Sequence, residues 1–291
     1  MPKMYSLCRE LDLIKRKIMK KSLFLLIIWI GIIQFSLAQP YSKIFGLANQ
    51  DTVHFTFTVK IPDIKAIDCY PQQITKITKN GENYEISLTT VNPYLDGSKL
   101  AKMEEARYDK SREYDRDIAQ FLRSTPLIDA QNEHIRQIAD TLFKDDTHTF
   151  AIINKALRFV HGYLSYSDSI AKQIDAGTCR TIDVNTIIRT KEGTCSEDTN
   201  LFTALMRYMN IPTRFAVGYL NVPEWKADST HAWPECYMEG AGWCSVDPTL
   251  PSYVFPHFAG IRMRYGVDFE DCDIETLNQD IEPIEFIRNP S

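Results

Sequence analysis

Cys195 stands where a helix is expected to begin. The segment Gly193-Thr-Cys-Ser-Glu197 places a threonine and a glutamate three residues apart. This spacing is typical of a capping box and makes Cys195 the first helical residue. A helix N-terminus offers N–H groups and a positive dipole end, which favour the reactive thiolate form of a cysteine. The charges of Glu197 and Asp198 oppose this effect, so we also expect a charged histidine as a partner.

His231 has the sequence context that best suits this partner. It opens the predicted strand His231–Met238, which returns through Glu239–Gly242 into a second strand that ends at Asp247. Two strands joined by so short a turn are antiparallel neighbours, so Asp247 is expected to return toward His231. A thiol, an imidazole and a carboxylate in this order can act as nucleophile, base and orienter of the base. His257 is the alternative base. The remaining histidines lack such a context: His54, His134, His148 and His161.

Three blocks that contain these residues resemble the core of the bacterial transglutaminase-like superfamily. They are GTCS…LFTALMR…IPTRFAVGY within 193–219, HAWPE at 231–235 and GWCSVDPT at 242–249. Flanking segments fit the same family: 125–128, 159–166, 189–193 and 262–268. The resemblance spans about residues 123–272, and it extends only loosely to the segment before them.

The resemblance implies a papain-like α+β fold and acyl transfer from an amide, without a cofactor or a metal. In it, Cys195 would be the nucleophile, His231 the general base and acid, and Asp247 the orienter. The Cys195 backbone N–H is the one donor that can be named for an oxyanion hole. A papain-type protease would have its histidine about 130–150 residues after the cysteine. Here the two are 36 residues apart.

We therefore expect an exported thiol acyltransferase or hydrolase that acts on a protein or peptide substrate. One alternative is a cysteine peptidase or amidase that acts by hydrolysis only. Another is a catalytically silent binding module that keeps the fold. The sequence leaves the substrate and the acyl acceptor open.

The surrounding elements follow from hydrophobic periodicity. Residues 52–61 alternate polar and apolar, and Asn80-Gly81 separates two further strand patterns at 74–79 and 84–90. These patterns predict a small antiparallel β module over 39–95. A charge-dense helical linker is expected over 96–122 and the catalytic domain over 123–275. Helical stripes come first in that domain, and strands at 213–220, 232–238 and 243–246 come after them. Residues 276–291 are expected to form a C-terminal tail.

The first 38 residues are typical of a secretory signal peptide. Lys20 and Lys21 precede an apolar run from Leu23 to Ile33, and Ser36-Leu37-Ala38 provides small residues for cleavage before Gln39. Met19 directly precedes the two lysines, so it is an alternative initiator to Met1. An uncleaved membrane anchor is the alternative, although roughly 20 apolar residues are usual for a membrane span. We expect a periplasmic or secreted protein with no stable membrane insertion after cleavage.

Charge and cysteine content narrow the function further. Without residues 1–38 the chain has 26 basic and 36 acidic residues, so it lacks the excess of basic residues that nucleic-acid binding needs. Six cysteines remain: Cys69, Cys179, Cys195, Cys236, Cys244 and Cys272. If Cys195 is a working thiolate, an odd number is left and not all can pair. Cys236 and Cys244 could face each other across a hairpin, but the sequence assigns no disulfide.

Overall fold

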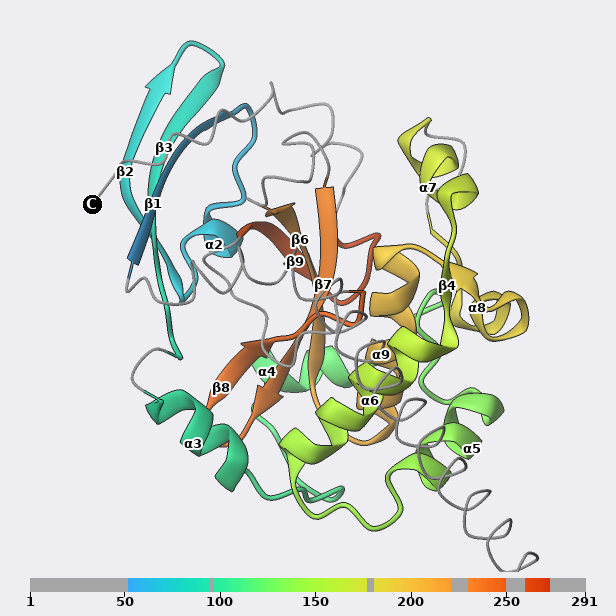
Figure 1. The fold of residues 1–291 in the computed structure, drawn as a ribbon. Coiled ribbons are helices and arrows are strands. Elements are labelled where there is room, and N and C mark those ends of the chain that lie inside the picture. The colour runs from blue at the N-terminus through green and yellow to red at the C-terminus, as the bar shows by residue number, and fades with distance from the viewer. Residues whose placement is uncertain (1–51, 95–96, 177–180, 221–229, 250–259, 273–291) are drawn as a thin grey trace, which may run out of the picture. The chain divides into compact units, whose positions relative to one another are not determined.

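The computed structural model describes residues 52–94, 97–176, 181–220, 230–249 and 260–272. The chain divides into two compact units, residues 1–47 and 48–291, and every described residue belongs to the second unit. The described part contains three sheets and the helices that accompany them (Figure 1). The predicted signal peptide and the predicted tail 276–291 lie outside the described residues. Within the described ranges, no helix combines the length and the apolar character needed to cross a membrane.

The predicted β module is an antiparallel sheet with the strand order β1-β3-β2. Its strands are β1 (Thr52–Val59), β2 (Gln72–Asn80) and β3 (Asn83–Val91). In β1 the apolar residues alternate with polar ones and are buried, as the period-two pattern predicts. Gly81 adopts a φ of 64° at the turn between β2 and β3, which confirms the predicted hairpin. A short helix, α2 (Ile64–Ile67), interrupts the module between β1 and β2.

The charge-dense segment that follows is partly helical and is anchored on one side. It contains α3 (Ser98–Glu105), α4 (Arg116–Ala119) and the 3₁₀ turn η1 (Gln120–Leu122). Lys99 and Met103 on α3 are buried. The Lys99 ammonium donates to the Trp243 carbonyl at 2.7 Å, so a lysine from this segment contacts the later sheet.

Helices then surround one buried helix, α9 (Cys195–Tyr208). Helices α5 (Glu133–Leu142), α6 (Thr149–Tyr163) and α8 (Val184–Thr190) all pack against α9. Of the apolar stripe predicted for α5, Ile135 and Ala139 are buried, and Ile138 and Leu142 are half-buried. The stripe predicted for α6 is buried, including Ile152. Helix α7 (Asp168–Asp175) follows a two-residue strand, β4 (Ser165–Tyr166). Strand β4 pairs in parallel with β5 (Glu192–Gly193), directly before α9.

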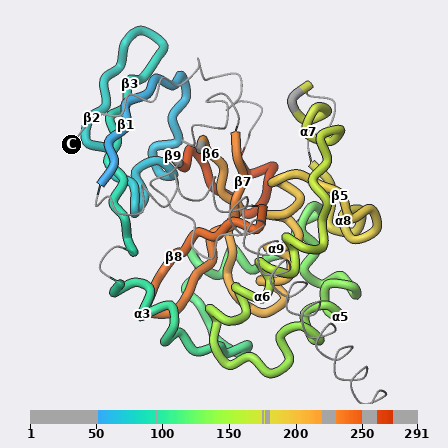
Figure 2. Tube along the Cα trace, in the orientation of Figure 1, coloured from blue at the N-terminus to red at the C-terminus, as the bar shows by residue number. Residues whose placement is uncertain are grey.

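The main sheet is antiparallel and has the strand order β8-β7-β6-β9. Its strands are β6 (Thr213–Leu220), β7 (Thr230–Met238), β8 (Gly242–Ser245) and β9 (Gly260–Gly266). Helix α9 packs against β7 and β6, and α2 of the β module contacts β9 (Figure 2). A Cβ on Gly218 would lie 1.8 Å from the Ile261 carbonyl oxygen, so β6 requires glycine where β9 passes it.

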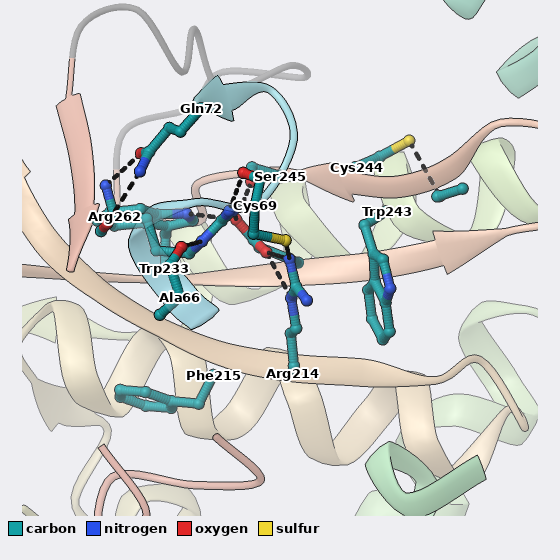
Figure 3. A network of polar contacts seen from close by, with 12 residues as sticks. Ala66, Cys69, Gln72, Arg214, Phe215, Trp233, Trp243, Cys244, Ser245 and Arg262 are labelled. Atoms are coloured by element: carbon teal, nitrogen blue, oxygen red, sulfur yellow. Dashed lines mark hydrogen bonds and ion pairs between the residues drawn. The ribbon is translucent and has the colours of Figure 1, made fainter. Parts of the chain in front are cut away.

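A buried polar network connects the β module to the main sheet (Figure 3). The Gln72 amide donates to the Arg262 carbonyl at 3.0 Å and accepts from the Arg262 N–H at 2.6 Å. The Arg262 guanidinium donates to the Glu235 carboxylate at 2.8 Å and also to the Ala66 and Cys69 carbonyls. Arg214 binds the same carboxylate at 2.5 Å.

Candidate active site

The turn before α9 fixes the position of Cys195. The Thr194 N–H and hydroxyl donate to the Glu197 carboxylate at 2.8 and 2.7 Å, and the Ser196 N–H donates back to the Thr194 hydroxyl. These bonds confirm the capping box and make Cys195 the first residue of the helix. Gly193 is required here because a Cβ would lie 2.3 Å from the Glu197 Cβ.

Glu197 also ties a distant segment to this turn. Its other carboxylate oxygen accepts from the Thr181 hydroxyl at 2.8 Å and from the Ile182 N–H at 3.0 Å. The Asn200 amide donates to both of those residues. Sequence reasoning missed Thr181 and Asn200, because no local pattern links residues 16 to 19 positions apart. The carboxylate is fully buried and accepts four hydrogen bonds, so it fixes the backbone on both sides of the nucleophile.

Strands β7 and β8 bring His231 and Asp247 together. His231 is the second residue of β7, and Asp247 follows β8, its antiparallel neighbour. His231 Nε2 lies 2.8 Å from Asp247 Oδ2. Both side chains are fully buried, whereas Cys195 is half-buried. Cys195 is therefore the least buried member of the group.

The electrostatics of His231 depend on its two partners. Burial by itself lowers the pKa of His231, but the charge and hydrogen bond of Asp247 raise it, as do the hydrogen bond and charge of Cys195. Together they raise the pKa of His231 to about 10. This shift favours the charged form of the imidazole, which has the thiol on one side and the carboxylate on the other. An imidazolium in this place stabilises a thiolate.

Trp233 connects this group to the polar network beneath it. The His231 and Trp233 rings stack with their centroids 6.1 Å apart at an interplanar angle of 23°. The Trp233 indole N–H donates to Glu235 at 3.4 Å. Alternate residues of a strand share one side, so His231, Trp233 and Glu235 form a row along β7.

Thr249 is a further contact of Asp247 that sequence reasoning did not assign to the site. Its backbone N–H donates to Asp247 Oδ1 at 2.9 Å. The two carboxylate oxygens are therefore held by different donors. The sequence Asp-Pro-Thr at 247–249 could have indicated this contact, because an aspartate side chain often accepts a hydrogen bond from the backbone N–H two residues later.

The other cysteines differ from Cys195. Cys236, Cys244 and Cys272 are buried free thiols, and burial raises the pKa of each; for Cys244 it reaches about 11. Cys236 and Cys244 face each other in the β7–β8 register, yet they form no disulfide. Cys179 and the alternative base His257 lie outside the described residues. Among the residues that the structure describes, no cluster of acidic, histidine or cysteine side chains could hold a metal ion.

Residues 136–248 match the family model of the transglutaminase-like superfamily. Over this region the chain is similar to a transglutaminase-like core. The matched region includes Cys195, His231 and Asp247. The match agrees with the resemblance carried by the three sequence blocks.

Two relatives place the transglutaminase-like core among known proteins. An uncharacterized protein of Bacillus subtilis (strain 168), YebA, is 23% identical over 222 residues. The match covers 67% of this chain but 29% of that protein. A solved structure from Cytophaga hutchinsonii, described as a candidate cysteine protease, has a TM-score of 0.53 at 16% identity. It covers 77% of this chain and 83% of that one. At this identity the likeness shows the fold, which is an α+β, papain-like transglutaminase core.

Proposed function

We propose that this protein is an exported thiol enzyme that attacks an amide carbonyl through Cys195, His231 and Asp247. The observation that carries the proposal is the arrangement of one half-buried cysteine next to a buried histidine that a buried aspartate holds at 2.8 Å. A cysteine, a histidine and an aspartate in this order are the groups that thiol acyl transfer needs. The substrate would be a protein or peptide that presents a glutaminyl or peptide amide.

The first half of the reaction forms an acyl-enzyme. The Cys195 thiolate attacks the carbonyl carbon, and we expect the Cys195 backbone N–H at the start of α9 to donate to the developing oxyanion. The His231 imidazolium then gives its proton to the amide nitrogen as the C–N bond breaks. Asp247 holds Nε2, so the proton exchange with the thiol and the substrate would run through Nδ1. The products are an acyl-thioester and a released amine.

The second half of the reaction releases the acyl group. Water or an amine attacks the thioester carbon, His231 accepts the proton from it, and the C–S bond breaks to restore the thiolate. Attack by water makes the protein a peptidase or amidase, and attack by an amine makes it an acyltransferase. The description of the Cytophaga hutchinsonii structure favours hydrolysis for that protein, and we propose that hydrolysis competes with transfer here.

The test is labelling followed by a substrate screen. The full chain is first treated with an alkylating thiol probe, and the labelled cysteine is located by mass spectrometry. Label on Cys195 supports the proposal, whereas label mainly on Cys69 contradicts it. Glutamine-containing peptides are then incubated with and without a primary amine, and products are read as cleaved, deamidated or amine-linked peptides. If none forms in excess of a Cys195→Ala control, the protein is the silent binding module instead.

Export is the second part of the proposal and has a separate test. The order of basic, apolar and small residues in 1–38 supports a cleaved signal peptide. Mass spectrometry of protein exported by a native-like host is expected to show an N-terminus at Gln39. A mature protein that retains Leu23–Ile33 would instead be a membrane-anchored enzyme.

A further inference from the structure

Asp198 is a buried carboxyl for which the reaction above has no use. It lies on α9 one turn after Cys195, and only 8% of it is exposed. Acidic residues in the first turn of a helix ordinarily face the helix N–H groups. The Asp198 carboxylate instead accepts the Thr249 hydroxyl at 2.8 Å.

Thr249 contacts two carboxylates at once. Its hydroxyl donates to Asp198 Oδ2, and its backbone N–H donates to Asp247 Oδ1 at 2.9 Å. Pro248 has no N–H, so Thr249 is the first residue after Asp247 that can donate in this way. Because His231 Nε2 holds the other Asp247 oxygen, the plane of this carboxylate is fixed from both sides.

The contacts close a ring that begins and ends on α9. It runs from Cys195 to His231 on β7, to Asp247 after β8, to Thr249, and back to α9 at Asp198. The triad residues come from three separate elements, and the Asp198–Thr249 bond joins the last of these to the first. A carboxylate acceptor makes this bond stronger than one between neutral groups.

We propose that Asp198 and Thr249 are positioning residues of the triad: Asp198 holds Thr249, and Thr249 holds Asp247 in line with His231. The ionised form of Asp198 also adds a negative charge that favours the His231 imidazolium. The consequence for the reaction rests on the proposed function, whereas the consequence for the reactivity of the Cys195 thiol does not.

The charge of Asp198 can change within the physiological range. Burial is the main cause that raises the pKa of Asp198 to about 7; the Thr249 hydrogen bond opposes it, the charges of Asp247 and Glu197 add to it, and that of His231 opposes it. These are the groups that face Asp198 from α9, from β7 and from the chain after β8. As the pH falls through about 7, Asp198 takes up a proton, the anionic acceptor is lost, and the support for the imidazolium weakens.

The test is the rate at which iodoacetamide alkylates Cys195 in the full chain, measured by mass spectrometry between about pH 5 and pH 9. The wild-type rate is expected to rise by about fivefold to tenfold through about pH 7, the scale of a charge-assisted hydrogen bond. Asp198→Asn keeps an acceptor for Thr249 but carries no charge. The part of the rise that is centred near pH 7 should therefore be lost, and the rate above about pH 7 should fall about fivefold to tenfold below wild type. Asp140→Asn is the matched control, since Asp140 accepts the Tyr208 hydroxyl at the far end of α9 at 2.8 Å.

A second pair of variants keeps the proposal testable if Asp198→Asn does not fold. Thr249→Ser keeps the hydroxyl and should behave as wild type, whereas Thr249→Val removes it and should lower the rate at about pH 8 by about tenfold. Equal rates for the Thr249→Val and Thr249→Ser variants, a wild-type profile without a step, or an unreactive Cys195 would each overturn the proposal. A merely structural role would lower thermal stability without changing the shape of the profile. Peptide turnover is measured in parallel: a changed alkylation profile without turnover leaves the positioning role standing and removes the proposed function.

Discussion

Two sites along strand β7, an open end at His231 and a closed end at Glu235, hold buried ionic groups of opposite design. At the open end, His231 pairs with Asp247, and it also contacts the half-buried Cys195. At the closed end, further along the strand, Glu235 is enclosed by Arg214, Arg262 and Ser245, and 1% of it is exposed. Trp233 lies between the two ends and contacts both.

The difference between the two ends is one of closure. At the closed end, the Arg262 guanidinium also donates to the backbone carbonyls of Ala66 and Cys69 in the β module. The Arg214 guanidinium lies 4.0 Å from the centre of the Tyr265 ring. All of these charged groups are therefore paired with other groups of the protein. At the open end the pair lies beside the half-buried Cys195. Buried charges of the first kind hold elements together, and those of the second kind can act on a substrate.

The strongest test of this comparison removes one thiol from each end. Cys195→Ala takes away the atom that forms the acyl bond, so turnover should fall by about 10⁴-fold or more. Cys69→Ala is the control, because its half-buried sulfur lies 3.8 Å from Arg214 in the closed network. Peptide turnover and thermal unfolding are measured for both. Substantial turnover in Cys195→Ala would show that the nucleophile is elsewhere.

Removing the Glu235 charge at the closed end should lower the stability of the protein and leave its turnover nearly unchanged. Glu235→Gln leaves two buried guanidinium groups without their carboxylate and should lower the free energy of unfolding by about 3–5 kcal/mol. Urea denaturation measures this loss. Turnover per folded molecule should stay within about threefold of wild type, since the Trp233 ring separates Glu235 from His231 along the strand. A large loss of turnover at unchanged stability would mean that the two ends act as one site.

Asp247→Asn removes the charge of this side chain at the open end and keeps its size and shape. The amide can hold the imidazole in the wrong tautomer, and in a serine-protease triad the same change costs about 10⁴-fold. A thiolate–imidazolium pair is already charged at rest, so a loss of about 10²-fold in turnover is expected here. Adding Cys195→Ala should cost little beyond Cys195→Ala alone, because members of one unit do not add. Additive losses would place Asp247 outside the triad.

The sequence predicted the open end better than the closed one. Thr194, Cys195 and Glu197 form a local pattern, and a short turn implies that His231 and Asp247 approach each other, so each contact follows from nearby residues. The Gln72–Arg262 and Arg262–Cys69 contacts join residues about 190 positions apart. Periodicity indicated the strand after Gln72, and the family resemblance indicated the segment that contains Arg262. Neither holds information on which faces meet.

Buried charged residues were the other feature that sequence reasoning could not place. The segment that contains Lys99 reads as solvated, yet the ammonium lies against Trp243 and 9% of the residue is exposed. From the sequence, Asp198 was a charge at the start of a helix that opposes the thiolate. In the structure it accepts a hydrogen bond from Thr249, which also contacts Asp247. Both depend on a partner from a distant element, which composition and spacing do not reveal.

The smallest expected effect is a dependence of stability on pH at the open end. The pKa of His231 is raised from its ordinary value of 6.5 to about 10 in the folded protein. Folding therefore favours proton binding, and the resulting stability is fully present below about pH 6.5 and is lost as the pH rises toward 10. Because the pair is buried and coupled, we expect a loss of the order of 2 kcal/mol.

Urea denaturation of wild type and His231→Gln between about pH 6 and pH 10 measures this effect, because the variant lacks the titrating ring. The difference between the two free energies of unfolding should shrink as the pH rises. His134→Gln is the matched control, since that ring lies near the exposed start of α5, and its difference from wild type should stay flat. A difference at His231 that grows with pH would mean that folding favours the neutral imidazole. The open end would then hold a neutral thiol–imidazole pair, in contrast to the fully charged network at the other end of β7.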